Sequence, residues 1–232
     1  MNLRHRVAAA TAAAALAATG LALAPTAQAS APTATKAPAA AAAPAVAKAA
    51  VGTTSLAAVL TAGGVAFDKN WNDYDIVTAA VLAVLKAKPT SAVKVLTDGT
   101  VALTAFIPND RAFQKLVKSL SRKTLKSEKA VFAAVAALGI PTVEAVLLYH
   151  VVPGATITAA MALKSNGAHL TTALGSTIRV RVYRHGPSIS LWDKDYNSRN
   201  PRVILSQTDI NAGNAQIAHG IDRVLRPINL RG

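Results

Sequence analysis

Hydrophobic residues recur at helical spacing in the region before residue 150. Residues 76–88 are apolar nearly all round, and a helix of that kind is expected to be buried centrally. Asp75 precedes this stretch and is expected to cap the helix, while Pro89 ends it. Shorter helical stretches are expected at residues 55–60, 127–138 and 142–148.

A strand followed by an amphipathic helix is expected in the middle of this region. Residues 101–107 are largely apolar and typical of a strand, and residues 108–110 then stop the strand and cap a helix. The expected inner face of the helix has apolar residues at positions i, i+3, i+4 and i+7, namely Phe113, Leu116, Val117 and Leu120. The opposite face carries three bases, Lys115, Lys118 and Arg122.

Towards the end of the chain the hydrophobic period shortens to two. Residues 177–183 alternate between aliphatic residues and polar or aromatic ones, which is typical of a half-buried strand. Arg179 and Arg181 fall on its polar side. Further strands are expected at residues 188–192, 203–207 and 216–224. Because helices dominate the first half of the domain and strands the second, the predicted fold class is α+β.

Residues 1–29 have the layout of a secretory signal peptide. Two arginines are followed by an almost purely apolar stretch, and small residues at positions 27 and 29 fit a cleavage site. The alternative is an uncleaved anchor helix, since about 18 apolar residues can just span a bilayer. Residues 30–52 are rich in Ala and Pro and are expected to form a semi-extended linker. One folded domain remains, residues 53–232, and no membrane span is expected after cleavage.

Composition and charge limit the kinds of site that this chain can form. The 232 residues include no cysteine, which excludes thiolate catalysis, disulfides, and Cys-based zinc or iron–sulfur sites. Lys and Arg number 25 against 11 Asp and Glu, so the formal net charge is +14. Residues 110–129 hold seven bases against two acids, and residues 179–202 hold six against two. Such an excess attracts polyanions, although the same charges could simply keep an apolar exported chain soluble.

Three stretches, in this order, have the character of family signatures. They are Thr-Ala-Phe-Ile-Pro-Asn-Asp-Arg-Ala-Phe at residues 104–113, Leu-Leu-Tyr-His-Val-Val-Pro-Gly at residues 147–154, and His-Gly-Ile-Asp-Arg-Val-Leu-Arg-Pro at residues 219–227. Together they resemble the fasciclin (FAS1) domain family in its secreted bacterial form. The resemblance implies a single α+β domain, with a compact wedge-like β-sheet structure and packed helices. It also implies an extracellular role in adhesion rather than catalysis.

Four residues within these signatures are candidates for a function: Tyr149, His150, His219 and Asp222. The resemblance links the Tyr149–His150 segment to adhesive contacts. From the residues alone, we expect Tyr149 to pack inward and His150 to brace a turn. Neither histidine has a carboxylate, a serine or a second histidine at a local spacing that would build a catalytic site. We therefore expect both histidines to bond backbone groups, Asp222 to anchor a strand end, and the protein not to be an enzyme.

Residues 68–75 resemble the start of a calcium-binding loop. The resemblance fails at position six, where Asp73 stands in place of the required Gly. It fails again at position twelve, where Ala79 replaces a bidentate carboxylate. A turn leading into the next helix is the better interpretation. No metal site and no cofactor are predicted from the sequence.

These observations predict a secreted adhesion module associated with the cell wall or the extracellular space. The expected binding surface consists of Lys115, Lys118 and Arg122 on the helix, with Arg179 and Arg181 on the strand. The expected partner is an anionic cell-wall or matrix polysaccharide, and a protein partner stays open. Nucleic acid is not expected in vivo, because the chain is exported and its few aromatic residues are not interleaved with the bases.

Two other functions stay open at this point. One is a hydrolase whose site assembles around His150 or His219 from residues distant in the sequence. The other is a scaffold with an apolar groove for a protein partner or a hydrophobic ligand. Buried imidazoles bonded to the backbone would argue against the hydrolase, and an exposed contiguous apolar patch would favour the scaffold.

Overall fold

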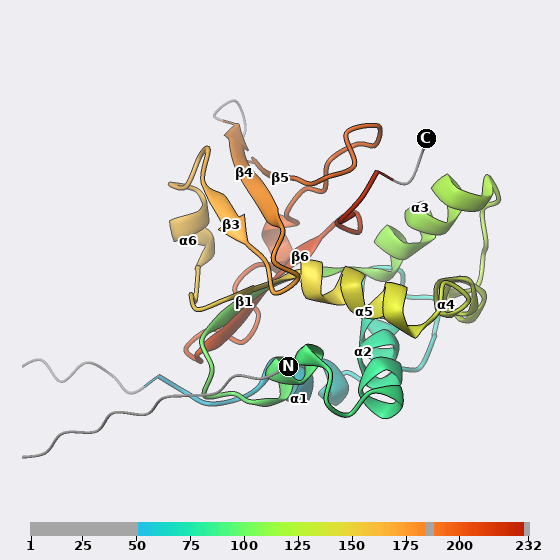
Figure 1. The fold of residues 1–232 in the computed structure, drawn as a ribbon, viewed down its shortest axis with the longest axis horizontal. Helices are drawn as coiled ribbons and strands as arrows, with labels where there is room; N and C mark the ends of the chain where they lie inside the picture. Colours follow the sequence, from blue (N-terminus) through green and yellow to red (C-terminus); the bar gives the residue numbers. More distant parts are fainter. Residues whose placement is uncertain (1–50, 184–187, 230–232) are drawn as a thin grey trace, which may run out of the picture. The chain divides into compact units, whose positions relative to one another are not determined.

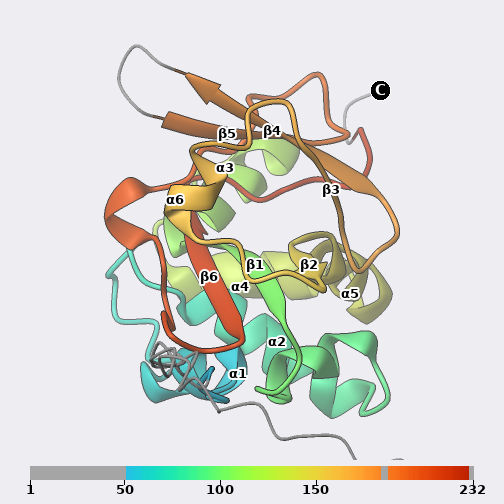
Figure 2. The same ribbon diagram turned by 90° about the vertical axis from the view of Figure 1, so that its left-hand side faces the viewer.

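The computed structural model describes residues 51–183 and 188–229, which lie within one unit of the chain, Lys48–Gly232. The predicted signal peptide and residues 30–50 of the predicted linker lie outside the described residues. Figures 1 and 2 show the described part from two directions, with helices towards one end and a small antiparallel sheet towards the other.

A three-stranded sheet occupies the middle of the unit. Its central strand β1 (Leu103–Pro108) pairs in parallel with β6 (Gln216–Ile221) along all six residues and antiparallel with β2 (Val151–Pro153). Every residue of β1 and β6 is buried. Burial on both faces explains why the sequence of β1 is a largely apolar run rather than an alternating one.

The second sheet is antiparallel throughout. Its strands are β3 (His169–Thr171), β4 (Thr177–Tyr183) and β5 (Ser188–Trp192), in that order. The predicted strands at residues 177–183 and 188–192 are confirmed with the same bounds. Ile178 and Val180 of β4 are buried, whereas Arg179 and Arg181 are half-buried on the other face. The predicted α+β class is therefore confirmed.

The helices are α1 (Leu56–Ala62), α2 (Asp75–Ala87), the 3₁₀ helix η1 (Ala92–Thr97), α3 (Asp110–Ser121), α4 (Glu128–Ala136), α5 (Ile140–Tyr149), α6 (Ala159–Ala162) and the 3₁₀ helix η2 (Leu205–Gln207). As predicted, α2 is largely buried, although Leu82 is 43% exposed. Within the described ranges no single helix is long and apolar enough to cross a membrane. The consecutive pair α4 and α5 meets that test only when both helices are counted together, and it is bent by 105°.

Strand β1 separates two hydrophobic clusters. Because successive side chains of a strand point to opposite faces, Ala105 and Ile107 pack into a cluster formed with the helices, including Ile76 of α2. Phe106 points the other way, into a cluster between the two sheets that includes Leu191 of β5. The view in Figure 2 shows this order of layers, with β1 and β6 between helices α1 and α2 and the β4–β5 hairpin.

The prediction of a strand at residues 203–207 is wrong, because this segment forms only an isolated bridge and a 3₁₀ helix. Arg202 forms a single bridge to Ser190 of β5, and the next residue, Val203, forms a single bridge to Ile221 of β6. The segment thus joins the two sheets residue by residue, and it then turns into η2. An extended pairing with either sheet would forfeit the contact with the other.

Two local predictions about the helices need correction. Asp75 does not cap α2; its carboxylate accepts a hydrogen bond from the Phe67 amide at 2.7 Å, and Asp110 Oδ1 instead accepts from the Ile76 amide at 3.0 Å. Leu120, predicted on the inner face of α3, is 40% exposed because the chain leaves the core near the helix end. The predicted cap of α3 is confirmed, since the Asn109 side chain accepts from the Ala112 amide.

Candidate functional site

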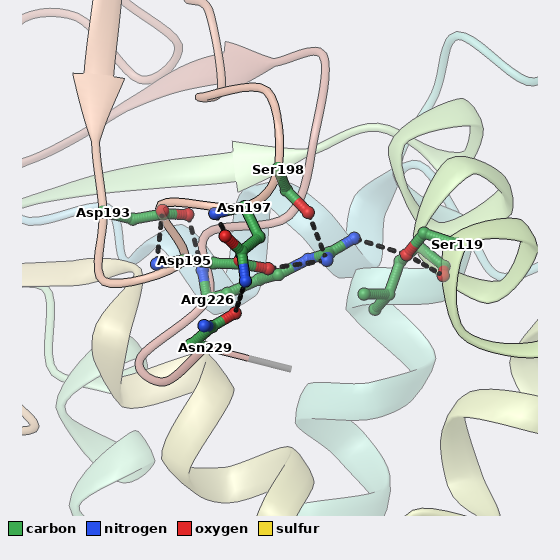
Figure 3. Close-up of polar contacts among 8 residues, drawn as sticks. Ser119, Asp193, Asp195, Asn197, Ser198, Arg226 and Asn229 are labelled. Carbon is green, nitrogen blue, oxygen red and sulfur yellow. Dashed lines mark hydrogen bonds and ion pairs between the residues drawn. The ribbon is translucent and has the colours of Figure 1, made fainter. Parts of the chain in front are cut away.

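A buried arginine fixes the loop that follows β5 against helix α3. Arg226 is 8% exposed, and its Nη1 donates to Asp195 Oδ2 at 2.7 Å and to Ser198 Oγ at 2.9 Å. Its Nη2 donates to Ser119 Oγ of α3 at 2.6 Å, and its backbone amide donates to Asp193 Oδ2 at 2.9 Å. Figure 3 shows the bonds to Asp195, Ser198 and Ser119 converging on the guanidinium, with Asp193 held at the backbone of the same residue. The loop therefore has a defined position on the surface.

Asp222 forms a second junction at the end of β6. Its Oδ1 accepts from the Arg202 amide at 2.8 Å, and its Oδ2 lies 3.6 Å from Lys115 Nζ and 3.9 Å from Arg223 Nε. Lys115 Nζ also donates to the Asp222 carbonyl at 2.8 Å. Burial lowers the pKa of Lys115, and the neighbouring Asp222 carboxylate opposes that change. Asp222 thus brings Lys115 and Arg202, from separate parts of the sequence, together with its own neighbour Arg223.

The Asp222 junction lines a surface hollow that we call the basic pocket, and the Arg226 junction lines a smaller hollow beside it. The basic pocket has a volume of about 300 Å³. Its walls are Tyr183, Ser190, Trp192, Arg199, Asn200, Arg202, Asp222 and Arg223. The smaller hollow shares Arg199 and Arg223 with the basic pocket and adds Lys115. Guanidinium groups from the loop and from the end of β6 therefore meet in one depression.

The β4–β5 hairpin supplies aromatic surface to the basic pocket. Trp192 is 38% exposed and Tyr183 is 44% exposed. Arg181 Cζ lies 4.8 Å from the centroid of the Trp192 ring, a cation–π contact that holds the ring in place. Arg181 is paired across the strands with Ser190, which also lines the pocket.

The five predicted binding residues are distributed unequally around this pocket. Lys115 and Arg181 reach it through Asp222 and Trp192. Lys118 and Arg122 are exposed on and after α3 and line neither hollow, while Arg179 is half-buried with an unpaired Nε. None of the ion pairs found within residues 51–183 and 188–229 involves Lys118, Arg122, Arg179 or Arg181.

Sequence reasoning missed the aromatic ring and the three arginines that the fold adds to the site: Trp192, Arg199, Arg202 and Arg223. Arg199 and Arg202 were counted only within a basic segment, and Arg223 only within a family signature. The charge excess of residues 179–202 was a signal for Arg199, but nothing in the local sequence indicates that Arg199 meets Arg223. That meeting depends on the Arg226 and Asp222 junctions.

Both histidines of the family signatures are buried and use both ring nitrogens on the backbone. His150 Nε2 accepts from the Leu225 amide at 2.9 Å, so Nδ1 carries the proton and donates to the Val146 carbonyl at 2.7 Å. His219 Nδ1 accepts from the Asp209 amide at 3.3 Å, and Nε2 donates to the Ile157 carbonyl at 2.8 Å. Burial lowers the pKa of His150 to about 4.

Tyr149 is also buried. Its hydroxyl donates to the Thr177 carbonyl at 3.1 Å, and burial raises its pKa above the usual range of a phenol. Tyr149 and His150 therefore both face the interior, which leaves neither side chain free for an adhesive contact in this conformation.

An apolar groove of about 630 Å³ lies between the end of α3, α5 and the chain after β6. Exposed Leu120, Leu138 and Ile228 form its rim. Pro141, Val146 and Leu225 lie among its other walls. This groove is an exposed apolar surface of the kind that the scaffold alternative requires.

Carboxylates gather where α2, α3 and α4 begin. One oxygen from each of Asp75, Asp110 and Glu128 can be chosen so that all three lie within 4.8 Å of one another, and all three residues are buried. Asp75 also belongs to a second such group, with Asp73 and the exposed Asp68. Among the described residues these are the acidic groups close enough to share a metal ion.

Comparison with known proteins gives two findings. The family model of the fasciclin domain matches residues 78–227, which is more than half of the chain. Among solved structures, a FAS1 domain pair from the insect cell adhesion molecule Fasciclin I is similar, with 18% sequence identity and a TM-score of 0.49. The similarity covers 75% of this chain and 51% of that one, so the chain spans about half of its length. No curated protein matches the sequence.

Proposed function

We propose, from the premise that this chain belongs to the fasciclin domain family, that it is a non-enzymatic adhesion module whose basic pocket binds anionic cell-wall or matrix polysaccharide. Fasciclin domains occur in extracellular or cell-surface proteins. This setting agrees with the signal peptide predicted at residues 1–29. The proposal moves the binding surface from the five predicted bases to the hollow that collects Arg199, Arg202 and Arg223 beside Trp192.

The observation that carries the proposal is the combination of guanidinium groups and an exposed aromatic ring in one hollow. Arginine matches the planar geometry of a carboxylate or sulfate and can bind it through two parallel hydrogen bonds. The Trp192 ring offers a flat apolar surface to the face of a sugar, and Asn200 and Ser190 offer partners for hydroxyl groups. An acidic polysaccharide presents all three features at once.

The burial and backbone bonding of His150 and His219 support a non-enzymatic role. A general base needs a ring nitrogen within reach of substrate. His150 and His219 are each at most 4% exposed, and both nitrogens of each ring bond to backbone groups. Neither imidazole can accept a substrate proton without breaking a bond that holds the fold. The hydrolase alternative, which placed its site around His150 or His219, therefore lacks an available imidazole at either position.

The test is binding of the purified protein to polygalacturonate, with neutral dextran as the reference polymer, over a range of salt concentrations. Arg199→Glu and Arg202→Glu are each expected to lower the affinity for polygalacturonate about tenfold or more at low salt, because each reverses a charge in the pocket. Trp192→Ala is expected to weaken binding by a salt-independent factor, since stacking is not screened.

The matched control is Lys94→Glu. Lys94 is exposed on η1, which packs mainly against α1, α2 and α5, and it lines neither the basic pocket nor the smaller hollow beside it. This variant changes the net charge by the same amount as the pocket variants do. A loss of affinity equal to theirs would show that net charge alone attracts the polymer, and affinity that ignores salt would exclude an electrostatic mechanism.

The apolar groove favours a second candidate function, binding of an elongated apolar small molecule. Its volume of about 630 Å³ falls within the range of small-ligand sites, and its rim consists of exposed aliphatic side chains. The test is titration with a fluorescent fatty acid. Leu120→Glu is expected to abolish binding while leaving polygalacturonate affinity unchanged, and wild-type protein that fails to bind would remove this candidate.

A further inference from the structure

Within the described ranges, the carboxylate cluster at the starts of α2, α3 and α4 is not neutralised by an ion pair. None of the ion pairs found among the described residues involves Asp68, Asp73, Asp75, Asp110 or Glu128. Asp110 is 0% exposed and Glu128 is 1% exposed. Burying a single unpaired carboxylate already carries a large desolvation penalty, and several like charges within contact distance add repulsion. Something must neutralise the cluster.

Some of the carboxylate oxygens are satisfied by backbone amides. Glu128 Oε2 accepts from the Lys69 amide at 3.0 Å, as Asp75 Oδ2 does from Phe67 and Asp110 Oδ1 from Ile76. Three buried oxygens, Asp73 Oδ1, Asp110 Oδ2 and Glu128 Oε1, accept no hydrogen bond from a protein donor, and the Asp73 and Asp110 carboxyl groups lie within hydrogen-bonding reach of each other. Buried acceptors are rarely left unpaired, and coordination of a bound ion is one way to satisfy them.

We propose that Asp75, Asp110 and Glu128, with Asp73 beside them, bind one calcium ion. The donors are all oxygens, which excludes the metals that favour nitrogen or sulfur. Ligand oxygens on opposite sides of a calcium ion lie about 4.8 Å apart, at twice the calcium–oxygen distance of about 2.4 Å. The oxygens of the buried trio fit within that span. Magnesium demands shorter, near-octahedral contacts that three fixed side chains meet less readily.

The site draws its ligands from three separate segments. Residues 68–75 fail as a linear calcium loop because Ala79 stands where the bidentate carboxylate is required. In the fold, Asp110 at the start of α3 and Glu128 at the start of α4 supply carboxylates from outside the loop. The bound ion would tie the loop to both helices and would hold Phe67 and Lys69 in the positive-φ conformations that the structure shows.

The alternative to calcium binding is protonation, in which a proton neutralises part of the carboxylate cluster. Burial, together with the neighbouring carboxylates, raises the pKa of Asp110, so a proton shared between Asp110 and Asp73 would also relieve the repulsion. The two explanations differ in what added calcium does. Calcium stabilises a fold that binds it, by an amount that grows with the logarithm of the calcium concentration above the dissociation constant, whereas a shared proton makes stability independent of calcium.

The experiment is thermal unfolding of the purified protein in chelator, then in 5 mM calcium or 5 mM magnesium. Calcium is expected to raise Tm by about 5 °C or more, as mass action predicts for a dissociation constant of about 0.1 mM, and magnesium by clearly less. Terbium is the second probe, because Trp71 in the loop can sensitise its luminescence, and calcium should displace it.

Glu128→Gln and Asp110→Asn are expected to abolish the calcium shift and the terbium signal. Both are close in shape to the native residue and remove a repelling charge, so each is expected to have a higher Tm than wild type in chelator. The matched control is Asp98→Asn, an exposed acid in another turn, which should retain both signals. No calcium shift and no terbium luminescence in the wild type, or equal shifts in Glu128→Gln, would overturn the proposal.

Discussion

The basic pocket and the carboxylate cluster are both concentrations of like charge, and the fold treats them in opposite ways. Arg199, Arg202 and Arg223 stand at a hollow open to solvent, where water screens their repulsion. Five of the eleven acids gather at the starts of three helices, and Asp75, Asp110 and Glu128 are removed from water. Exposed like charges are screened by water and stay available to bind a polymer. Buried like charges need a cation or a proton within the fold to neutralise them.

Arg226 lies between these extremes, as a buried charge that the fold neutralises from within. Its partner Asp195 has a side chain that is 0% exposed, and the two meet at 2.7 Å. The same cluster positions the loop that carries Arg199. The basic pocket therefore depends on a buried pair of opposite charges, and the comparison predicts where substitutions should have large effects and where they should not.

The largest effect is expected at Arg226. Arg226→Ala leaves Asp195 buried without its partner and should cost about 3–5 kcal/mol of the free energy of unfolding. Adding Asp195→Ala should recover part of that loss, because the orphaned charge is gone. Urea denaturation of the single and double variants gives both values. A double variant no more stable than Arg226→Ala would show that lost packing, rather than the unpaired charge, sets the cost.

An intermediate effect is expected at His150, which is a buried base. It tests whether burial disfavours the charged form of an imidazole as it disfavours the charged form of a buried carboxylate. Its pKa is about 4 in the fold, below the ordinary value of 6.5, so the unfolded chain binds more protons between those pH values. Stability should therefore fall as pH drops from about 6.5 to about 4, by about 3 kcal/mol in total from this group.

The measurement is urea denaturation of wild type and His150→Gln at pH 7 and pH 4.5. Gln can donate to the Val146 carbonyl and accept from the Leu225 amide, as His150 does, but it does not titrate. The variant should lose less stability than wild type over this range. Parallel losses in both proteins would assign the acid sensitivity to other groups.

The smallest effect is expected at Arg122, which ends α3 in the left-handed conformation with φ 59°. Arg122→Gly should stabilise the protein by about 0.5–1 kcal/mol, because glycine adopts that conformation without strain. Arg122→Ala removes the same charge but keeps the strain. Since Arg122 lies outside the basic pocket, both variants should bind polygalacturonate alike and close to wild type. A tenfold loss of polygalacturonate affinity in both variants would show that α3 is part of the binding surface.

Much of the fold could be predicted from the order and period of apolar residues. The strands at residues 177–183 and 188–192, the buried helix α2 and the cap at Asn109 all follow from local patterns that the structure confirms. The strand at residues 203–207 could not be judged in this way, because its apolar residues serve two sheets at single bridges rather than one sheet along its length.

The candidate sites were less accessible to sequence reasoning. The five predicted bases identified a surplus of charge but not its arrangement, since Lys118 and Arg122 lie outside the pocket while Trp192 and Arg223 line it. The calcium-loop test was limited to a contiguous segment. It therefore could not find Glu128, which lies far along the chain from Asp75 yet within contact distance in the fold.

The sequence by itself determined the family, the α+β class and the positive excess, because these depend on residue identity, order and local period. Tertiary structure decided which charges share a surface and which lose their water, since those depend on segments that meet only after folding. Asp222 joins Lys115, Arg202 and Arg223 at one end of the central sheet, and three helix starts collect the acids elsewhere. Both proposed sites therefore depend on burial and on proximity in space, neither of which is a property of position along the chain.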